Sequence, residues 1–278
     1  MQAVLRFAKY HALGNDFVVV DRWDGGEEIT ADQAVWLCNR HHGIGGDGVL
    51  TLWPDAPHDG RMQIHNSDGS QSAMCGNGLR CLARYLYDAR RVPADRPAVE
   101  ISTSSGVHRC ERLAPNLFRV DMGVPQWAHP ELPESGPDGR ALLTVGERDF
   151  PAVVVHFGNP HAVIFVERED PALLARSYGA AIEHHLAFPE RVNVSFVTPA
   201  SGGFRAVVHE RGVGITLACG SGAAAIAASA VKCGLWAAGE EMAIGLPGGT
   251  LRAAVGPGGQ TFLTGPSEIA FSGEVVWP

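Results

Sequence analysis

The sequence has only two lysines, Lys9 and Lys232. This scarcity matters because enzymes that use pyridoxal phosphate hold it as a Schiff base on a lysine. Lys9 lies near the first apolar run and Lys232 comes late in an alanine-rich stretch, so neither is in a phosphate-binding context. A Walker or dinucleotide-binding glycine loop is also missing, since "GIGGDG" is an isolated cluster. The sequence therefore favours chemistry that needs no cofactor.

Metal-binding and disulfide-forming cysteine patterns are missing too. There is no C-x-x-C pair and no Cys/His spacing typical of a zinc site, so we expect no metal. In a reducing compartment all six cysteines should be thiols, and most should be small core residues. The six are Cys38, Cys75, Cys81, Cys110, Cys219 and Cys233.

Long apolar runs and an excess of basic charge are absent as well. The longest strongly apolar run, "AAAIAASAV", is well short of a bilayer span, and the N-terminus lacks the apolar core and cleavage site of a signal peptide. The net charge is −8 and the basic residues are scattered, which excludes the positive surface that nucleic acid or an anionic membrane requires. We expect a cytoplasmic protein whose partner is a small molecule.

What the sequence does contain indicates a globular α/β (α+β) protein. Its 278 residues are 45% hydrophobic and 19% charged, which is enough core for two domains. Short strand-like runs bounded by Gly, Pro and Asp dominate, among them "DFVVVD", "GVLTLW", "RMQIHN", "PAVVVHF", "HAVIFVE" and "RVNVSFV". Few of them alternate between apolar and polar residues, so we expect strands that are buried on both faces.

Two helices are predicted, and each follows a cysteine. The first follows Cys75 in "MCGNGLRC", and the second follows Cys219 in "LACGSGAAAIAA". The second is apolar almost all round, which suits a helix enclosed by a sheet. Gly234 is a plausible stop for it.

The two halves of the chain are related by a constant offset. From Cys75 to Cys219 is 144 positions, and the same offset relates Asn15 in "LGNDFVVV" to Asn159 in "FGNPHAVIF". It also relates Asn66 to Glu210, each of which closes a predicted strand. Three landmarks at one offset indicate an ancient duplication.

A proline-rich stretch from Gly123 to Gly139 lies between the two copies and is the expected boundary region. After the second copy, "GPSEIAFSGEVVW" predicts one more strand, which we expect to return to the first domain. The predicted domains are therefore 1–118 with 265–278, and 119–264.

The position of the two cysteines suggests a reaction. A helix N-terminus offers unpaired N–H groups and a partial positive charge, which bind carboxylates and lower the pKa of a thiol. We expect Cys75 and Cys219 to be rich in thiolate near neutral pH and to flank one substrate between two facing domains. That arrangement suits inversion of a carbon α to a carboxylate, in which one thiolate removes a proton and the opposite thiol supplies another. His161 and Glu210 are candidates to pair with Cys75 and Cys219, respectively.

Several stretches resemble diaminopimelate epimerase, a family that interconverts LL- and meso-diaminopimelate in bacterial lysine and peptidoglycan synthesis. The resemblance covers nearly the whole chain and includes "FAKYHALGNDFVVVD", "RHHGIGGDGVL", "NSDGSQSAMCGNGLRC", "GNPHAVIFV", "HERGVGITLACGSGAAA" and "LTGPSEIAFSGEV". It implies two pseudo-symmetric domains, each a sheet rolled around a central helix, with the active site between them. It also implies a homodimer that works without metal or cofactor.

The resemblance also implies roles for individual residues. Cys75 and Cys219 match the acid/base pair, and His161 and Glu210 match their partners. Arg211 suits a two-point clamp on the distal carboxylate. The other residues that match substrate-binding groups are Asn15, Asn66, Gly76, Asn77, Asn159, Asn193, Gly220 and Ser221.

Two positions depart from the family pattern. Ile215 stands where the family commonly has a glutamate, and His65 stands where it has an apolar aromatic residue. These departures leave open a racemase of another amino acid, of the proline or hydroxyproline type, which shares the two-cysteine design. A non-catalytic amino-acid binding protein would not need both cysteines, and an isomerase of the phenazine-pathway type lacks the pair.

Overall fold

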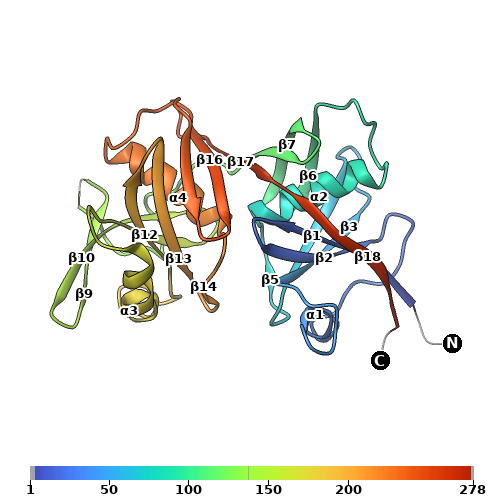
Figure 1. Cartoon of the computed structure of the whole chain (residues 1–278), viewed down its shortest axis with the longest axis horizontal. Coiled ribbons are helices and arrows are strands. Elements are labelled where there is room, and N and C mark those ends of the chain that lie inside the picture. Colours follow the sequence, from blue (N-terminus) through green and yellow to red (C-terminus); the bar gives the residue numbers. More distant parts are fainter. Residues whose placement is uncertain (1–3, 137, 277–278) are drawn as a thin grey trace. The chain divides into compact units, whose positions relative to one another are not determined.

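The computed structural model describes residues 4–136 and 138–276, so the outer ends of the first predicted domain and residue 137 of the proline-rich stretch lie outside it. The described residues divide into two compact units (Figure 1). One boundary falls after Val120 and the other before Gly265. The N-unit contains the chain up to Val120 and the segment from Gly265 onward, and the C-unit contains the chain from Asp121 to Thr264. The sequence placed these boundaries after residue 118 and before residue 265.

The N-unit is built on one mixed sheet. Its strands pair in the order β18–β1–β2–β3–β4–β6–β7–β8, with the short β5 against β4. The β2/β3 and β4/β6 pairs are parallel and the others are antiparallel. The strands are β1 (Val4–Ala12), β2 (Asn15–Asp21), β3 (Gly48–Trp53), β4 (Gly60–Asn66), β5 (Gln71–Ser72), β6 (Ala98–Thr103), β7 (Gly106–Ala114), β8 (Leu117–Asp121) and β18 (Glu268–Val276).

The C-unit repeats this sheet. Its strands pair in the order β9–β10–β11–β12–β13–β15–β16–β17, with the short β14 against β13. The β11/β12 and β13/β15 pairs are again the parallel ones. The strands are β9 (Arg140–Val145), β10 (Arg148–His156), β11 (Pro160–Phe165), β12 (Asn193–Ala200), β13 (Gly203–Glu210), β14 (Gly214–Ile215), β15 (Met242–Leu246), β16 (Gly249–Val255) and β17 (Thr261–Pro266).

The repeat is therefore structural as well as numerical. Both sheets have the same strand order, with parallel pairs in the same places, and β18 takes the place in the N-unit that β9 takes in the C-unit. Because β18 pairs antiparallel with β1, the last described strand belongs to the first unit. The predicted duplication is confirmed by this topology.

One helix in each unit packs against strands from across its sheet. In the N-unit it is α2 (Gly76–Asp88), which contacts β1, β2, β3, β4, β6 and β7. In the C-unit it is α4 (Gly220–Lys232), which contacts β10, β11, β12, β15 and β16. The two helices begin and end 144 positions apart. Most residues of both are buried, so the expectation of a central helix within a rolled sheet is confirmed.

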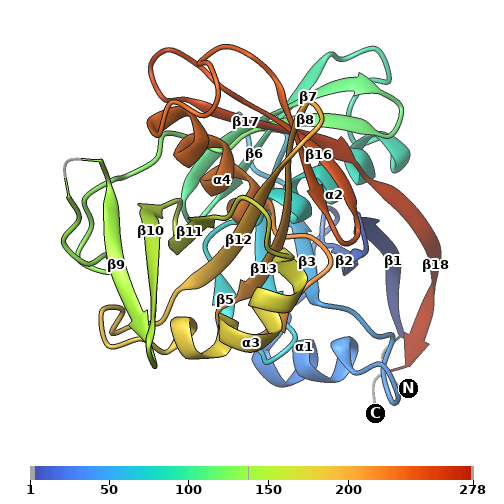
Figure 2. The ribbon, with the colours of Figure 1, turned by 60° about the vertical axis from the view of Figure 1, so that its left-hand side comes forward.

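Two further helices were not predicted from the sequence. They are α1 (Ala31–Cys38), against β3 and β4, and α3 (Pro171–Glu183), against β12 and β13 (Figures 1 and 2). Thr30 caps α1 in a reciprocal capping box with Gln33, and Asp170 caps α3 ahead of a proline. These helices cover the sheet face turned away from α2 or α4, which explains why β3 and β12 are apolar without alternation. Within the described residues no helix is long and apolar enough to cross a membrane.

The two central helices end alike but with different residues. After α4, Gly234 has φ +69° and the next N–H donates to the carbonyl of Ala230, so Gly234 stops the helix as predicted. After α2, the corresponding residue is Arg90, with φ +55°, and the next N–H donates to the carbonyl of Leu86. The same left-handed turn is therefore made once by a glycine and once by an exposed arginine.

Replacing Arg90 by glycine should stabilise the protein by about 1 kcal/mol. A residue with a Cβ is strained in the left-handed region by roughly 1–2 kcal/mol, and the greater freedom of glycine in the unfolded chain offsets part of the gain. Gly234→Ala is the matched control and should destabilise by a similar amount. Urea unfolding of the three proteins measures both changes, and a destabilised Arg90→Gly variant would contradict the argument.

Candidate active site

Both predicted cysteines cap a central helix. Cys75 is the N-cap of α2, and its Sγ accepts the N–H of Gly78 at 3.4 Å. Cys219 is the N-cap of α4, and its Sγ accepts the N–H of Gly222 at 3.3 Å. The pattern of a small polar residue between two glycines permits this close turn, because a Cβ on Gly222 would lie 3.1 Å from the sulfur. Gly76 and Gly220 are the buried first residues of the two helices.

The Cys219 thiol is not a thiolate, and this corrects the expectation from the sequence. Only 3% of Cys219 is exposed, and burial raises the pKa of its thiol well above 9.0. The negative charge of Glu210 raises the pKa further, while hydrogen bonds from Ser221 and from the N–H of Gly222 lower it. The loss of hydration outweighs the positive end of the helix. Cys219 is therefore a protonated thiol that donates to the Glu210 carboxylate.

Glu210 ends β13 and is held on its other side by Thr216. The Thr216 hydroxyl donates to Oε1 of Glu210 at 2.5 Å. The Ser221 hydroxyl lies 3.6 Å from the Cys219 sulfur. The structure thus brings together three residues that the sequence singled out, Cys219, Glu210 and Ser221.

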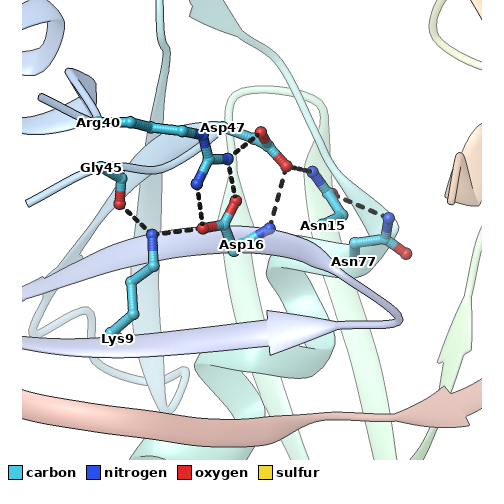
Figure 3. A network of polar contacts seen from close by, with 7 residues as sticks. All are labelled: Lys9, Asn15, Asp16, Arg40, Gly45, Asp47 and Asn77. Carbon is cyan, nitrogen blue, oxygen red and sulfur yellow. Dashed lines mark hydrogen bonds and ion pairs between the residues drawn. The ribbon is translucent and has the colours of Figure 1, made fainter. Parts of the chain in front are cut away.

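Asn15 and Asn77 also lie together, in the N-unit. The Nδ2 of Asn77 donates to Oδ1 of Asn15 at 2.9 Å, and Nδ2 of Asn15 donates to Asp47 at 2.8 Å (Figure 3). Asn15 begins β2, and Asn77 lies in the first turn of α2 and is 1% exposed. This contact places an amide of β2 at the N-terminus of the helix that Cys75 caps.

His161 and Asn159 form a pair at the start of β11. The Nε2 of His161 lies 2.9 Å from Oδ1 of Asn159 and is the donor, because a carbonyl oxygen can only accept. His161 is fully buried, and burial, helped by the positive charges of His156 and Arg211, lowers its pKa to about 3. His161 is therefore a neutral imidazole, and its Nδ1 is a buried acceptor without a partner among the described residues.

Asn193 and Arg211 meet through the main chain. Oδ1 of Asn193 accepts the N–H of Arg211 at 3.0 Å, and Nδ2 of Asn193 donates to the carbonyl of Pro160. The side chain of Arg211 is 36% exposed, and its guanidinium donates to the carbonyl of Glu190 and lies 3.6 Å from the Glu131 carboxylate. Arg211 is thus held at its backbone while its charged end reaches solvent.

Within the described part of the chain, the side chain of Asn66 binds Ser70 and Ser72 and not another predicted site residue. Its Nδ2 donates to the Ser70 hydroxyl at 2.9 Å, and its Oδ1 accepts from the Ser72 hydroxyl at 3.2 Å. These are contacts within the β4–β5 turn. The proposed partners Cys75 and His161 belong to different units, so their pairing stays a prediction, as does the placing of both cysteines around one substrate.

The two departures from the family pattern occupy opposite members of one cross-strand pair that is repeated in the two units. His65 is 2% exposed and pairs in register with Gln71, whereas Ile215 is 45% exposed and pairs in register with His209. His65 and His209 are 144 positions apart, as are Gln71 and Ile215. Both departures therefore lie on the short hairpins that precede the two cysteines.

A cluster of possible metal ligands also occurs in the C-unit. The ligand atoms of His129, Glu131 and His156 lie within 4.8 Å of one another. The two imidazole rings are stacked, with centroids 3.7 Å apart and planes 15° apart. Their in-plane lone pairs then run parallel rather than converging, which does not suit a shared metal ion.

Most of the six cysteines were expected to be small core residues, and Cys81 and Cys233 differ in this respect. Cys81 is fully buried, and burial raises its pKa to about 12. Cys233 is instead the half-buried C-cap of α4, because the helix ends one residue before it.

Sequence reasoning missed two charged residues beside the N-unit site, Asp47 and Arg80. Asp47 holds Asn15, and Arg80 lies in α2 at 0% exposure and donates to Asn77 at 2.5 Å. The available signal was Arg80 itself, a charged residue that adjoins the apolar stripe of a helix. It was overlooked because an arginine in a helix is ordinarily assigned to a solvated face.

The family model described as diaminopimelate epimerase matches residues 7–128 and 153–270. A curated diaminopimelate epimerase from Pelotomaculum thermopropionicum is 40% identical, over 97% of this chain and 98% of that protein. Another, from a Synechococcus strain, is 42% identical over 97% of both chains.

Solved structures with low sequence identity show the same fold. A hydroxyproline epimerase from Agrobacterium vitis superposes with a TM-score of 0.74 at 16% identity, covering 99% of this chain and 94% of that one. A phenazine biosynthesis protein of the PhzF family from Bacillus anthracis has a TM-score of 0.69 at 14% identity, covering 99% of this chain and all of that one. With a family model and relatives that match almost its full length, the chain belongs to the diaminopimelate epimerase family.

Proposed function

We propose that this chain interconverts LL- and meso-diaminopimelate without a cofactor, using Cys75 and Cys219 as the acid/base pair. The observation that carries the proposal is the repeated thiol, which caps a central helix with its sulfur on a first-turn N–H in both units. Curated relatives with the printed name diaminopimelate epimerase support the choice of substrate.

The proposed reaction inverts the carbon next to a carboxylate. It requires one sulfur on each face of that carbon, so that one removes the proton and the other delivers a new one. The carbanion between the two steps is stabilised by N–H donors aimed at the carboxylate, and a helix N-terminus supplies such donors without reorganisation. Gly76, Asn77, Gly220 and Ser221 are the first-turn residues that we assign to this role.

The resting protonation of Cys219 suggests its first task. A buried thiol that is protonated at rest can deliver its proton to the substrate carbon. In the reverse direction Cys219 must act as base, and Glu210 can then accept the thiol proton. We assign His161 to Cys75 in the same sense. Its neutral imidazole has an unpartnered Nδ1, which can accept a thiol proton.

Arg211 is proposed to bind the distal carboxylate of the substrate. A guanidinium and a carboxylate form two parallel hydrogen bonds, and for them Arg211 would exchange one hydrogen bond to the Glu190 carbonyl and a long 3.6 Å contact to Glu131. Asn193 accepts the backbone N–H of Arg211, and this contact fixes the point from which the Arg211 side chain extends. We place Asn66 and Asn159 with the same end of the substrate.

Arg211→Lys should lower kcat/KM for diaminopimelate by roughly 10- to 100-fold, because an ammonium group cannot make the two-point contact. Most of the loss should appear in KM, since the distal carboxylate does not change in the reaction. Arg205→Lys, on an exposed arginine of the same unit, is the control and should change neither constant. An unchanged specificity constant for Arg211→Lys would show that another group binds the distal end.

The experiment that tests the proposal is incubation with LL-diaminopimelate in deuterated water. We expect meso product with deuterium at one α-carbon, because the delivered proton comes from a thiol that exchanges with solvent.

The second candidate is a proline or hydroxyproline epimerase, favoured only by the fold shared with the hydroxyproline epimerase. Turnover of proline or hydroxyproline, with none of diaminopimelate, would select that candidate.

We also propose that the enzyme supplies lysine and peptidoglycan precursors in the cytoplasm and works as a homodimer. The six cysteines are free thiols, which agrees with a reducing compartment.

The homodimer is supported by the edge strand of the N-unit. Strand β18 pairs with β1 and carries Ile269 and Phe271 at 44% and 50% exposure. An edge strand with exposed apolar side chains favours pairing with a second copy.

A further inference from the structure

A chain of hydrogen bonds joins an exposed carboxylate to a buried guanidinium through two side-chain amides. Asp47 accepts from Nδ2 of Asn15 at 2.8 Å, and Oδ1 of Asn15 accepts from Nδ2 of Asn77 at 2.9 Å (Figure 3). Oδ1 of Asn77 then accepts from Nη2 of Arg80 at 2.5 Å. All four side chains belong to the N-unit.

The two ends of this chain decide which way the amides face. A carboxylate can only accept hydrogen bonds and a guanidinium can only donate them, whereas an amide can do either with its two ends. Asn15 must therefore turn its NH2 to Asp47, which leaves its oxygen for Asn77. Asn77 must turn its oxygen to Arg80, which leaves its NH2 for Asn15. Reversing both amides would set oxygen against carboxylate and NH2 against guanidinium.

We propose that Asp47 and Arg80 are positioning residues that fix the Asn15 amide so that it offers an N–H, and never its oxygen, to the substrate carboxylate. The chain of contacts uses one hydrogen of the Asn15 NH2 group, and the second is the one that we assign to the substrate. This inference deepens the proposed function and rests on it, because it takes Asn15 to be a substrate-binding residue.

Asp47 is itself held in place. Arg40 donates to its Oδ1 at 2.9 Å, and the backbone N–H of Asp16 donates to its Oδ2 at 3.1 Å. The Asp16 carboxylate is bound by Arg40 at 2.7 and 3.0 Å and by Lys9 at 2.7 Å. Burial alone would raise the pKa of Asp16, but Arg40 and Lys9 lower it to about 2. The Asp16 carboxylate therefore stays ionised at neutral pH, and it fixes the Arg40 guanidinium that in turn holds Asp47 (Figure 3).

Arg80 is not required by the fold. The equivalent position in α4, 144 residues later, is Ala224, which is buried in a helix of the same length. A buried guanidinium is costly, and Nε and Nη1 of Arg80 have no acceptor among the described residues. Within the part of the chain that the structure describes, the hydrogen bond to Asn77 is therefore the contact that accounts for the presence of Arg80. In the C-unit the residue equivalent to Asn15 is Asn159, and its side-chain amide is bound by His161 instead of by another amide.

The test compares four variants with the unaltered enzyme. Arg80→Met removes the donor-only end, and Asp47→Asn gives the other end a group that can donate as well as accept. We expect each to lower kcat for diaminopimelate roughly 10- to 100-fold, the loss of one misplaced hydrogen bond to a charged group, with a smaller change in KM. Arg80→Lys keeps a donor-only end and should recover most of the activity. Asp59→Asn is the control, because Asp59 is a buried, ion-paired carboxylate of the same unit outside this chain of contacts, and it should leave kcat unchanged.

A second readout does not depend on turnover. The two protons of the Asn15 NH2 group have separate NMR resonances, and the one bound to Asp47 should be shifted well away from the other. That separation should shrink in Asp47→Asn and Arg80→Met and persist in Arg80→Lys and Asp59→Asn.

Each outcome decides the inference. Equal kcat in Arg80→Met and the unaltered enzyme, or an unchanged Asn15 spectrum in both end variants, would overturn it. So would a loss of kcat that Arg80→Lys fails to recover, since that would indicate a structural or purely electrostatic role. If the unaltered enzyme does not act on diaminopimelate, the proposed function fails, and the spectra alone then decide whether Asp47 and Arg80 orient Asn15.

Discussion

Cys219→Ala and Cys75→Ala should each lower the rate of diaminopimelate inversion by about 10³-fold or more while the fold stays intact. Inversion needs an acid and a base on opposite faces of one carbon, and alanine can be neither. The measurement is the rate of meso formation from the LL isomer, followed together with the melting temperature. Cys110→Ala is the matched control, because Cys110 is a fully buried thiol of the N-unit outside the proposed site.

Deuterium exchange refines this prediction. An enzyme with one remaining thiol can still remove and return a proton on a single face, so each variant should exchange the α-hydrogen of one epimer without inverting it. The two variants should favour opposite epimers. Near-normal inversion by either variant would exclude the two-thiol mechanism, and exchange of the same epimer by both would place the two sulfurs on one face.

The central helices could be predicted because their sequences carry the signal locally. Cysteine followed by two glycines marks the helix start, and the apolar residues of α4 leave no side for solvent. The duplication was visible for a related reason, since the offset of 144 is held by residues at strand and helix ends. The spacing between these ends is the same in both halves of the chain, so the repeat can be read from residue numbers alone.

The helices α1 and α3 were missed although both carry N-cap signals. α1 has only eight residues, and its capping box from Thr30 to Gln33 is a short pattern next to longer apolar strands. α3 begins at Pro171, directly after its cap Asp170, but has a mixed composition with a glycine inside it. Their helical state is decided by packing on the outer face of the sheet, which a local pattern does not record.

The protonation of the site could not be predicted from residue types. A helix N-terminus lowers a thiol pKa and burial raises it, and which effect wins depends on the exposure of Cys219 and the closeness of Glu210. The orientation of Asn15 is a second case. It depends on Asp47 and Arg80, which lie 32 and 65 positions away in the sequence and reach it only through the fold.

Mild oxidation should inactivate the substrate-free enzyme by joining Cys75 to Cys219. Two sulfurs that flank one carbon at roughly 3–3.5 Å each are about 7 Å apart when substrate is bound, and a disulfide needs about 2.05 Å. Without substrate, a modest movement could close that distance. With diamide as oxidant, the two thiols lose two electrons and two protons, and diamide takes them up as the hydrazine. Since burial and Glu210 keep Cys219 protonated, we expect the half-buried Cys75 to react first and Cys219 to resolve the adduct, with a rate that rises with pH.

Saturating diaminopimelate should protect the enzyme from diamide, and dithiothreitol should restore it. Cys75→Ala and Cys219→Ala should each form no cross-link, whereas Cys110→Ala should form it at the normal rate. Peptide mapping without reduction decides the matter. Inactivation that leaves the peptides of Cys75 and Cys219 unlinked would mean that the two thiols cannot reach each other, and the proposed site with one sulfur on each face of the substrate carbon would then fail with it.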